Sequence, residues 1–248
     1  MQTIDRVVQL LELLSKYNDG IGINQISETV DLPLSTTHRM LNGLKKDGYV
    51  TQDNVSKRYK LGVGILSLAV NMLNNMDIIK ITMPFIEDLS TKYGQLMFLS
   101  VFENNKIICV DMVNNSSGMK YYVQVGSTMP AYCSASGKII VAYQDDLQID
   151  KILKSESRTK YTNNTKLDTN EIKRELKMAR KLGYAVCNEE MEIGAIALST
   201  PIFNRHGNVF ASITIMLVKH LENEEYRIIE DLKEASDKIS RCLGYIKI

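Results

Sequence analysis

Apolar positions recur at helical spacing in three successive stretches at the start of the chain. The first stretch predicts a helix that ends at the breaker 18–20 and buries Ile4, Val7, Val8, Leu11 and Leu14. The second predicts a short helix over 23–30, which Pro33 separates from the third. The third predicts a helix that begins with Ser35 as its N-cap, ends before Gly48 and buries Thr37, Met40, Leu41 and Leu44.

The other face of the third predicted helix carries small, polar and cationic residues. It presents Ser35, Thr36, Arg39, Asn42, Gly43 and Lys46. After this helix, two short strands at 49–51 and 58–61 flank a polar turn, a pattern typical of a β-hairpin. Three helices with a tight turn between the second and the third, followed by a hairpin, predict a winged helix-turn-helix whose third helix reads a DNA major groove.

Positive charge is concentrated on this third helix and on the hairpin. Residues 34–61 hold six cations and two acids, a net charge of +4, whereas the whole chain is only +1 and the remainder is therefore −3. A local cluster of cations is the electrostatic footprint expected for phosphate binding. Pattern and charge together favour DNA binding over a merely solvated surface helix.

Beyond residue 62, apolar helices are mixed with apolar strands. Helices are predicted over 65–75, 76–93, 134–143, 168–182 and 222–243, and strands over 96–102, 107–113, 120–125, 184–187, 195–203 and 208–218. Strands joined as hairpins and flanked by helices predict an α+β domain on an antiparallel sheet. We therefore expect a DNA-binding domain over 1–62, a linker helix over 63–76 and a second domain over 77–248.

The composition is that of an ordinary soluble globular protein, with 44% hydrophobic and 24% charged residues among 248. Charged residues near the N-terminus argue against a signal peptide, and the most apolar run, 209–218, is too short to span a bilayer. The four cysteines and three histidines are scattered, so neither a disulfide framework nor a metal site is predicted, and no cofactor. We expect a cytoplasmic protein that does not bind a membrane.

Small residues over 126–138 precede and open the helix predicted from 134. Small side chains at a helix start leave backbone N–H groups accessible, and the helix dipole favours an anion there. The stretch could hold a small carboxylate, or it could simply cap a helix that packs close to a strand. Its chemistry alone does not separate these two interpretations.

Two sets of motifs make the chain resemble the IclR family of bacterial transcriptional regulators. In the first domain they are Asp5-Arg6, residues 34–41 (LSTTHRML) and residues 58–62 (RYKLG). In the second domain the family's C-terminal signature is matched in register by Gly183, Glu190, Ala197, Leu198, Ser199, Ile202, Phe203 and Asn204. Cys187 departs from the signature, which prefers Asp or Ser at that position. The resemblance covers nearly the full chain, in both domains and in order.

The resemblance implies a GAF-like second domain that binds a small effector, often an organic acid, and thereby changes operator binding. Carried over by position, the effector pocket comprises Tyr121, Met129, Ala135, Ser136, Cys187, Ala197, Thr214 and Met216. Because a thiol is a weak hydrogen-bond donor, Cys187 favours a more apolar ligand or a shifted binding mode. Glu190 is expected to support its loop rather than to touch the ligand. The resemblance also makes repression the expected direction of regulation.

On this interpretation the DNA contacts are Ser35, Thr36, Thr37, Arg39, Asn42, Lys46, Lys57 and Arg58. One helix reads too few base pairs, so we expect a homodimer on palindromic double-stranded DNA. A dimer of dimers is common among members of the family.

Two other classes of protein remain as alternatives to a regulator without enzymatic activity. An enzyme could use Cys133 or Cys187 as a nucleophile with His206 as the base, although none of these residues lies in a catalytic motif. A protein-interaction module would use the winged helix to bind another protein, and it would show no salt-dependent affinity for DNA.

Overall fold

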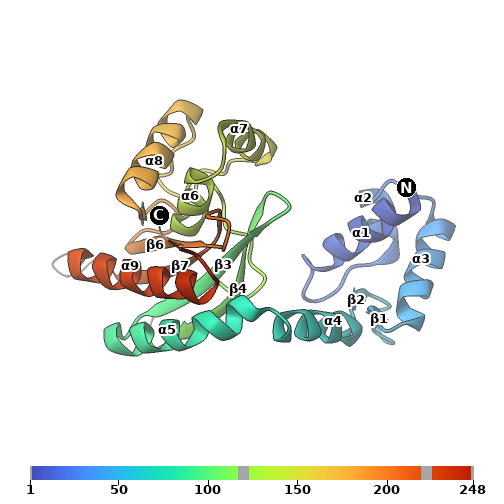
Figure 1. Ribbon diagram of the computed structural model, residues 1–248. Helices are drawn as coiled ribbons and strands as arrows, with labels where there is room; N and C mark the ends of the chain where they lie inside the picture. Colours follow the sequence, from blue (N-terminus) through green and yellow to red (C-terminus); the bar gives the residue numbers. More distant parts are fainter. Residues whose placement is uncertain (1, 117–122, 219–224, 247–248) are drawn as a thin grey trace. The chain divides into compact units, whose positions relative to one another are not determined.

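The computed structural model describes residues 2–116, 123–218 and 225–246 (Figure 1). The chain divides into two compact units, Met1–Asn75 and Met76–Ile248. The segment expected to link the two domains forms helix α4, Val63–Asn74, which belongs to the first unit. Within the described ranges, none of the helices combines the length and the apolar character that a membrane span requires.

The first unit is a winged helix-turn-helix, as predicted. Helices α1 (Gln2–Leu14), α2 (Ile23–Thr29) and α3 (Leu34–Lys46) precede the antiparallel pair β1 (Val50–Gln52) and β2 (Tyr59–Leu61). The hydrophobic core of the unit is formed by Leu10, Leu13, Leu14, Ile21, Ile26, Leu41, Val50 and Tyr59. The N–H of Ile21 donates to the carbonyl of Tyr59 over 3.0 Å, and the reverse bond is 2.9 Å long. These two bonds tie the hairpin to the turn before α2.

The buried face of α1 differs from the predicted one. Ile4 and Val8 are 70% and 49% exposed, whereas Leu10 and Leu13 are buried. The core of the unit lies against the C-terminal half of α1, so the apolar side chains of its first two turns lie beyond the core and remain exposed. Helical spacing alone is compatible with burial of either set of residues, and the packing of α1 against β2 determines which set is buried.

The start of α3 also differs from the prediction. Ser35 is exposed inside the first turn, and Pro33 occupies the N-cap position without a side-chain hydrogen bond. The carbonyl of Pro33 accepts hydrogen bonds from the N–H of Thr36 over 2.9 Å and from that of Thr37 over 3.0 Å. Because proline fixes its φ near the value found here, −55°, the chain enters the helix at Leu34 without a hydroxyl cap.

Helix α4 begins against the turn that ends α3. The N–H of Gly62 donates to the carbonyl of Tyr49 over 2.8 Å, and the N–H of Gly64 donates to the carbonyl of Gly48 over 3.0 Å. A Cβ atom on Gly62 would lie 2.2 Å from the Gly48 oxygen, and one on Gly64 would lie 2.8 Å from it, so both positions require a glycine. Helix α4 contains neither a buried residue nor a charged one.

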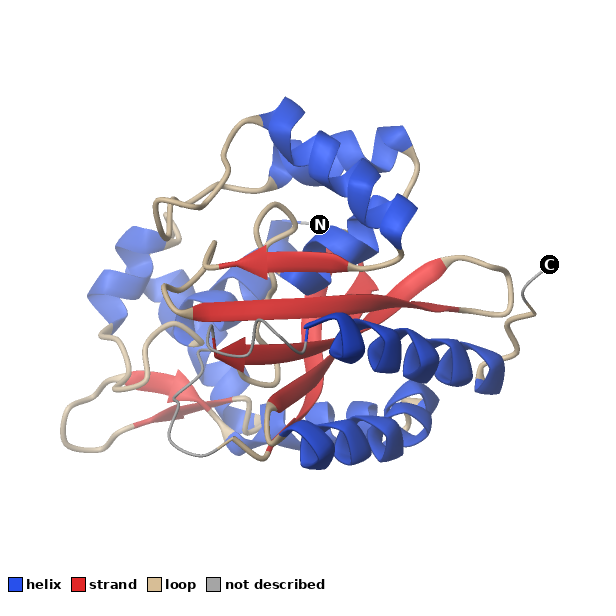
Figure 2. Cartoon of the chain, turned by 90° about the vertical axis from the view of Figure 1, so that its left-hand side faces the viewer, coloured by secondary structure: helices blue, strands red, loops and turns tan. Residues whose placement is uncertain are grey.

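The second unit is an α+β domain built on one five-stranded antiparallel sheet. Its strands are β3 (Leu96–Glu103), β4 (Lys106–Asn114), β5 (Ala185–Asn188), β6 (Ala195–Phe203) and β7 (Val209–Val218), in the order β4–β3–β7–β6–β5. Helices α5 (Asp77–Tyr93) and α9 (Glu225–Cys242) cover one face of the sheet (Figure 2). The other face carries α6 (Ala135–Ala142), α7 (Asp146–Ser155) and α8 (Thr169–Leu182).

Two elements of this unit depart from the sequence patterns. Helix α7 was not predicted, although Ile149, Ile152 and Leu153 recur at helical spacing and are buried. Asp145 caps it by accepting a hydrogen bond from the N–H of Gln148 over 2.8 Å. The strand predicted over 120–125 lies partly outside the described residues, and 123–125 form no strand.

Three side chains lie next to one another across the sheet. Met216 of β7 is the Cα partner of Ala197 of β6, and Ala197 is the partner of Cys187 of β5. Since side chains alternate along a strand, all three point to the same face of the sheet, the one that α6 covers. This row of residues forms the floor on which the candidate site is built.

Candidate functional site

The exposed face of α3 gathers side chains that were predicted to contact DNA. Those of Ser35, Arg39, Asn42 and Lys46 are exposed, and Thr36 is half-buried. On the opposite side of the helix Leu41 is fully buried in the core of the unit. The helix therefore presents a polar and cationic face to solvent while its other face anchors it.

Thr37 is placed differently from the other predicted DNA contacts. Its side chain is fully buried, and its hydroxyl donates a hydrogen bond to the carbonyl of Pro33 over 3.3 Å. Its spacing of four residues from Leu41 puts it on the core side of α3. Burial on that side removes Thr37 from the surface that DNA could reach, so the prediction of a DNA contact there is not kept.

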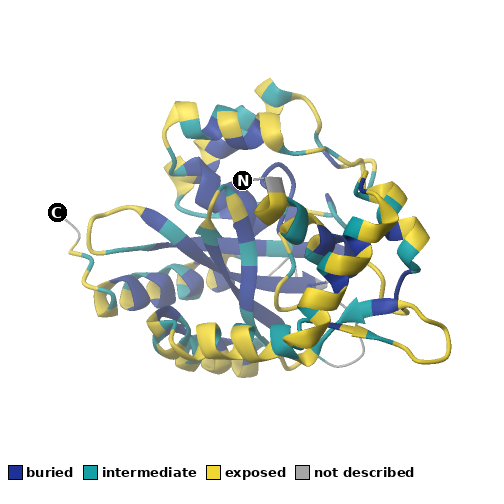
Figure 3. Ribbon diagram, turned by 90° about the vertical axis from the view of Figure 1, so that its right-hand side faces the viewer, coloured by how far each residue is buried: buried dark blue, intermediate teal, exposed yellow. Residues whose placement is uncertain are grey.

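The turn of the hairpin is exposed over 53–58 (Figure 3), and the carboxylate of Asp53 helps to hold it. Oδ1 of Asp53 accepts hydrogen bonds from the N–H of Ser56 over 2.7 Å, from its hydroxyl over 2.8 Å and from the N–H of Val55 over 3.1 Å. These bonds, that of the Ser56 N–H above all, lower the pKa of Asp53. The ordered turn presents the two predicted cations of the wing, Lys57 and Arg58, to solvent.

A cavity of about 620 Å³ opens in the second unit beside the N-terminus of α6, and it is called the effector pocket after the ligand that the sequence predicts for this region. It is lined by Phe98, Val123, Met129, Ser134, Ala135, Tyr161, Thr162, Cys187, Met191, Glu192, Ile193, Ala195, Ala197 and Met216. Most of these side chains are apolar, and neither Lys nor Arg is among them.

The first turn of α6 supplies the polar end of this pocket. Ser134 Oγ caps the helix by accepting a hydrogen bond from the N–H of Gly137 over 3.0 Å. The N–H groups of Ala135 and Ser136 also belong to the first turn, where a helix offers no backbone acceptor. Since this is also the positive end of the helix dipole, it suits the carboxylate of a ligand whose apolar part fills the rest of the pocket.

Five of the eight residues predicted for the effector line this pocket, namely Met129, Ala135, Cys187, Ala197 and Met216. Ser136 is fully buried outside the lining, and its hydroxyl has no hydrogen-bond partner among the described residues. Thr214 is also outside the lining, because its hydroxyl is buried against Ser199 and donates to Ser199 Oγ over 2.8 Å. Tyr121 lies outside the described residues.

Other residues of the pocket were missed by the sequence analysis. Tyr161 and Thr162 come from the segment between α7 and α8, and residues 191–193 follow β5. Loops carry no periodicity, so nothing in these segments predicts a site. Phe98 is different, because it is the Cα partner of Thr214 on the neighbouring strand. Strand alternation could have placed Phe98 on the same face as Met216.

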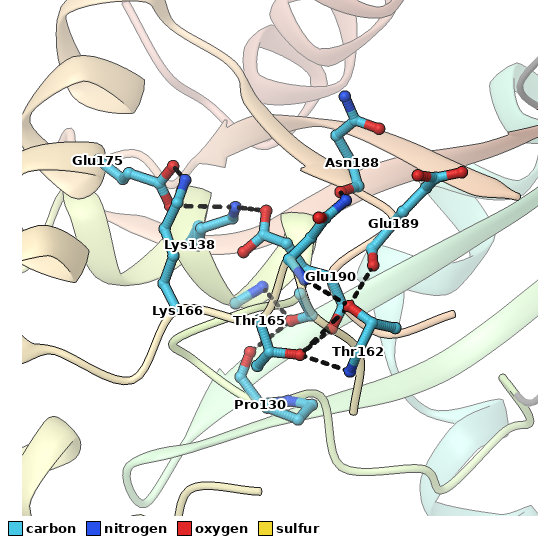
Figure 4. A network of polar contacts seen from close by, with 12 residues as sticks. Pro130, Lys138, Thr162, Thr165, Lys166, Glu175, Asn188, Glu189 and Glu190 are labelled. Carbon is cyan, nitrogen blue, oxygen red and sulfur yellow. Dashed lines mark hydrogen bonds and ion pairs between the residues drawn. The ribbon is translucent and has the colours of Figure 1, made fainter. Parts of the chain in front are cut away.

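A nearly buried ion pair stands beside the pocket and joins α6 to the loop after β5. Lys138 Nζ lies 2.5 Å from Glu190 Oε1 and 3.4 Å from Glu175 Oε2, and Lys166 also pairs with Glu175 (Figure 4). Burial raises the pKa of Glu190, and the charge of Lys138 opposes this rise. The Thr165 hydroxyl donates to the carbonyl of Glu190 over 2.6 Å. Glu190 thus fixes its loop through both its side chain and its backbone.

The two cysteines considered above as nucleophiles, Cys133 and Cys187, are poor candidates for catalysis. Burial raises the pKa of the Cys187 thiol and that of the Cys133 thiol, so both are protonated at neutral pH. A cysteine nucleophile requires a thiolate and an adjacent base. The proposed base, His206, is exposed, and its Nε2 accepts a hydrogen bond from Nε of Arg205 over 3.0 Å. In the part of the chain that the structure describes, no three His, Cys, Asp or Glu side chains gather to hold a metal ion.

Comparisons with known proteins cover both units of the chain. Residues 70–241 match the family model of the bacterial transcriptional regulator IclR C-terminal domain, and residues 3–54 match that of the IclR helix-turn-helix domain. An uncharacterized HTH-type transcriptional regulator of Haemophilus influenzae is 31% identical, with 100% of this chain and 94% of the relative covered. The DNA-binding transcriptional repressor YiaJ of Escherichia coli is 30% identical, with 98% and 88% covered.

Solved structures share the fold. An IclR transcriptional regulator from Alicyclobacillus acidocaldarius matches with a TM-score of 0.84 at 25% identity, over 98% of this chain and 99% of that one. An IclR homolog from Microbacterium hydrocarbonoxydans, solved in complex with 4-hydroxybenzoate, matches with a TM-score of 0.80 at 22% identity, over 97% and 98%.

Proposed function

Because the chain belongs to the IclR family of bacterial transcriptional regulators, we propose that it binds a palindromic operator and that a small organic acid modulates this binding. Helix α3 and the hairpin, which acts as the wing, contact the DNA. The acid occupies the effector pocket beside α6. The protein works in the cytoplasm, where its DNA is found.

The observation that carries the DNA-binding part is the division of α3 into two faces. Leu41 is fully buried, whereas Arg39, Asn42 and Lys46 are exposed. A helix anchored in this way can enter the major groove with its polar face against the base edges. We assign Arg39 to a base edge, and the remaining contacts to bases or to the phosphate backbone through Ser35, Thr36, Asn42, Lys46, Lys57 and Arg58.

The walls of the effector pocket favour an acid with an apolar body. Phe98 and Met216 offer apolar contact, and Ala135 brings to the pocket the first turn of α6, whose N–H groups have no acceptor within the helix and can bind a carboxylate. An aromatic or branched carboxylic acid has this combination of groups. The homolog from Microbacterium hydrocarbonoxydans is complexed with 4-hydroxybenzoate, which is an acid of this kind.

Helix α4 supports the pairing of two copies of the chain. Five of its apolar side chains are between 43% and 83% exposed, namely Val63, Leu66, Leu68, Val70 and Met72. An exposed apolar surface on a helix without charges is the kind of surface that another chain covers. A two-fold dimer also brings the second recognition helix that a palindrome requires. We therefore propose a homodimer, which can pair again into a dimer of dimers.

Repression is the direction that we propose. The relative YiaJ is described as a transcriptional repressor, and it is 30% identical to this chain over 249 residues. In a repressor, the operator complex blocks transcription, and the effector changes the fraction of operator that is bound.

A DNA-binding measurement on the full chain tests the first part of the proposal. Duplexes that the purified protein selects from a random-sequence pool supply the operator, and fluorescence anisotropy gives its affinity. We expect log affinity to fall linearly with log salt, by about 0.9 per phosphate contact. A protein-interaction module would select no duplex and show no salt-dependent affinity, and that result would refute DNA binding.

The effector is tested with a panel of benzoate, 4-hydroxybenzoate, phenylacetate, isovalerate and pyruvate. At least one acid should raise the melting temperature and change the anisotropy of the operator complex. Ala197→Leu places extra volume in the effector pocket and should abolish both responses, whereas Thr214→Val, outside the lining, should preserve them. A flat response to every acid, or a response that survives Ala197→Leu, would show that the pocket is misassigned.

A further inference from the structure

A second hollow borders the same two segments that wall the effector pocket. It is an open cleft of about 680 Å³, here called the polar cleft, and it is lined by residues of 160–175 and of β5 with its following loop. We propose that the polar cleft binds a neutral, hydroxyl-rich small molecule of the size of a monosaccharide or a cyclic polyol. This ligand is different from the acid of the effector pocket.

Neighbouring residues of one strand face the two hollows in turn. Cys187 lines the effector pocket, whereas Val186 and Asn188 line the polar cleft. The same holds before α8, where Thr162 lines the pocket and Asn163 lines the cleft. The two hollows therefore share a thin wall but have different linings, one mostly apolar and the other polar.

The charges in the polar cleft are balanced when Lys138, which is buried and pairs with the lining without being part of it, is counted with them. Glu175 and Glu190, which line it, are paired with Lys138 and Lys166 (Figure 4). Lys160 and Glu171 add one exposed charge of each sign. A balanced lining offers no net attraction to a charged molecule, so a neutral ligand fits it best.

Amide groups supply the remaining polar surface of the cleft. Asn163, Asn164 and Asn188 line it, and all three are exposed. An asparagine side chain both donates and accepts hydrogen bonds, and so does a hydroxyl group. Several hydroxyls on a compact ring or chain can pair with the donor and the acceptor groups of several amides at once. A carboxylate would use only the amide donors, and an ammonium group would use only the amide acceptors.

One buried atom of the lining lacks a hydrogen bond. The side chain of Glu190 is only 5% exposed and its Oε1 is bound by Lys138, but its Oε2 has no partner among the described residues. A buried acceptor without a donor is unfavourable, because it has lost its contact with water and gained nothing in return. A ligand hydroxyl that reaches the inner end of the cleft would supply the missing donor.

Saturation-transfer NMR on the full chain tests the proposal with D-glucose, D-xylose and myo-inositol as probes at millimolar concentration. Asn163→Ala and Asn188→Ala remove amides from exposed positions of the cleft, so neither should disturb folding. Asn170→Ala is the matched control, an exposed asparagine on α8 outside the lining. Ala197→Leu obstructs the effector pocket and serves as the second control.

We expect at least one probe to bind saturably, with an affinity that each cleft variant lowers by about fivefold or more and that both controls leave unchanged. The absence of saturable binding by every probe overturns the proposal, and so does binding that the cleft variants do not weaken or that Ala197→Leu abolishes. These results are independent of the acid and DNA measurements, so this site and the proposed regulatory function can fail separately.

Discussion

Lys138 Nζ lies 2.5 Å from Glu190 Oε1, and the two side chains are 4% and 5% exposed. Lys138 belongs to α6 and Glu190 to the loop after β5. The pair therefore joins the helix whose N-terminus lines the effector pocket to a loop that also borders the pocket. Burying a charge away from water costs free energy, and the fold tolerates these two buried charges only because they pair with each other.

Loss of the cation should therefore be costly. We expect Lys138→Met to lower the free energy of unfolding by about 3–5 kcal/mol, because the Glu190 carboxylate remains buried without its partner. Urea denaturation measures the change. Lys173→Met is the control, since it removes a largely exposed pair with Asp150 and should change the free energy of unfolding far less than Lys138→Met does. Equal losses of unfolding free energy in the two variants would show that the buried pair stabilises the protein no more than the exposed pair does.

Thr214 should matter for stability and not for the effector. Thr214→Val removes the hydrogen bond to Ser199, while Ser199 Oγ still donates to the carbonyl of Ile213 over 3.0 Å. No buried donor is left unpaired, so we expect a loss of about 1 kcal/mol in thermal or urea unfolding. Titration of the active acid should give an unchanged affinity. A marked loss of affinity for the acid would instead show that Thr214 takes part in binding the effector.

The two faces of α3 should respond differently to substitution. Arg39→Ala should cost about 1–3 kcal/mol of operator binding and relax specificity at one base pair. Thr37→Val should leave operator affinity unchanged, because that side chain is fully buried. Anisotropy titrations on the selected operator and on single-base variants measure both. A Thr37→Val protein that folds normally but binds DNA poorly would refute this division of the helix.

A wing cation should act through the phosphates alone. Lys57→Ala should weaken binding about equally on all sequences and reduce the salt slope by about one unit. The measurement is the same titration repeated over a series of salt concentrations. A change in base preference without a change in slope would instead place Lys57 at a base edge.

The contact between α5 and α9 should show a pH dependence. Burial raises the pKa of Asp231, but hydrogen bonds from Lys92 and Tyr93 outweigh it and hold the pKa below its ordinary value of 3.8. A carboxyl group with a lowered pKa stabilises the fold above 3.8, and this contribution is lost as the pH falls through the folded-state pKa.

Asp231→Asn should accordingly destabilise the protein at neutral pH by less than about 1 kcal/mol, since the group is near the surface. The difference from the parent protein should shrink as the pH is lowered below 3.8. Urea titrations at several pH values measure this, and a difference that is constant with pH would argue that the ionised carboxylate has no part in it.

Local patterns were enough to predict the winged helix and most of the sheet, because hydrophobic spacing is set by the residues of each element. They failed where contacts with another part of the chain determine which residues are buried or where a helix begins. Ile4 and Leu10 both fit a helical face of α1, and only the position of the core leaves Ile4 exposed. In the same way Ser35 could have capped α3, but Pro33 already provides the geometry of the cap.

The effector pocket shows the same limit. Met216, Ala197 and Cys187 lie on neighbouring strands at positions that alternation makes equivalent, so their presence in one site could be predicted. Thr214 shares that alternation, but its hydroxyl is bound to Ser199 and does not reach the cavity. Tyr161 comes from a loop, whose path depends on tertiary contacts that no periodicity records.

The glycines at the start of α4 have a mechanical consequence. Gly62 and Gly64 bind the carbonyls of Tyr49 and Gly48 directly, at the point where α3 has just ended. Because the start of α4 is hydrogen-bonded to the residues that directly follow α3, we expect a rotation of α4 to move the C-terminal end of α3 with it.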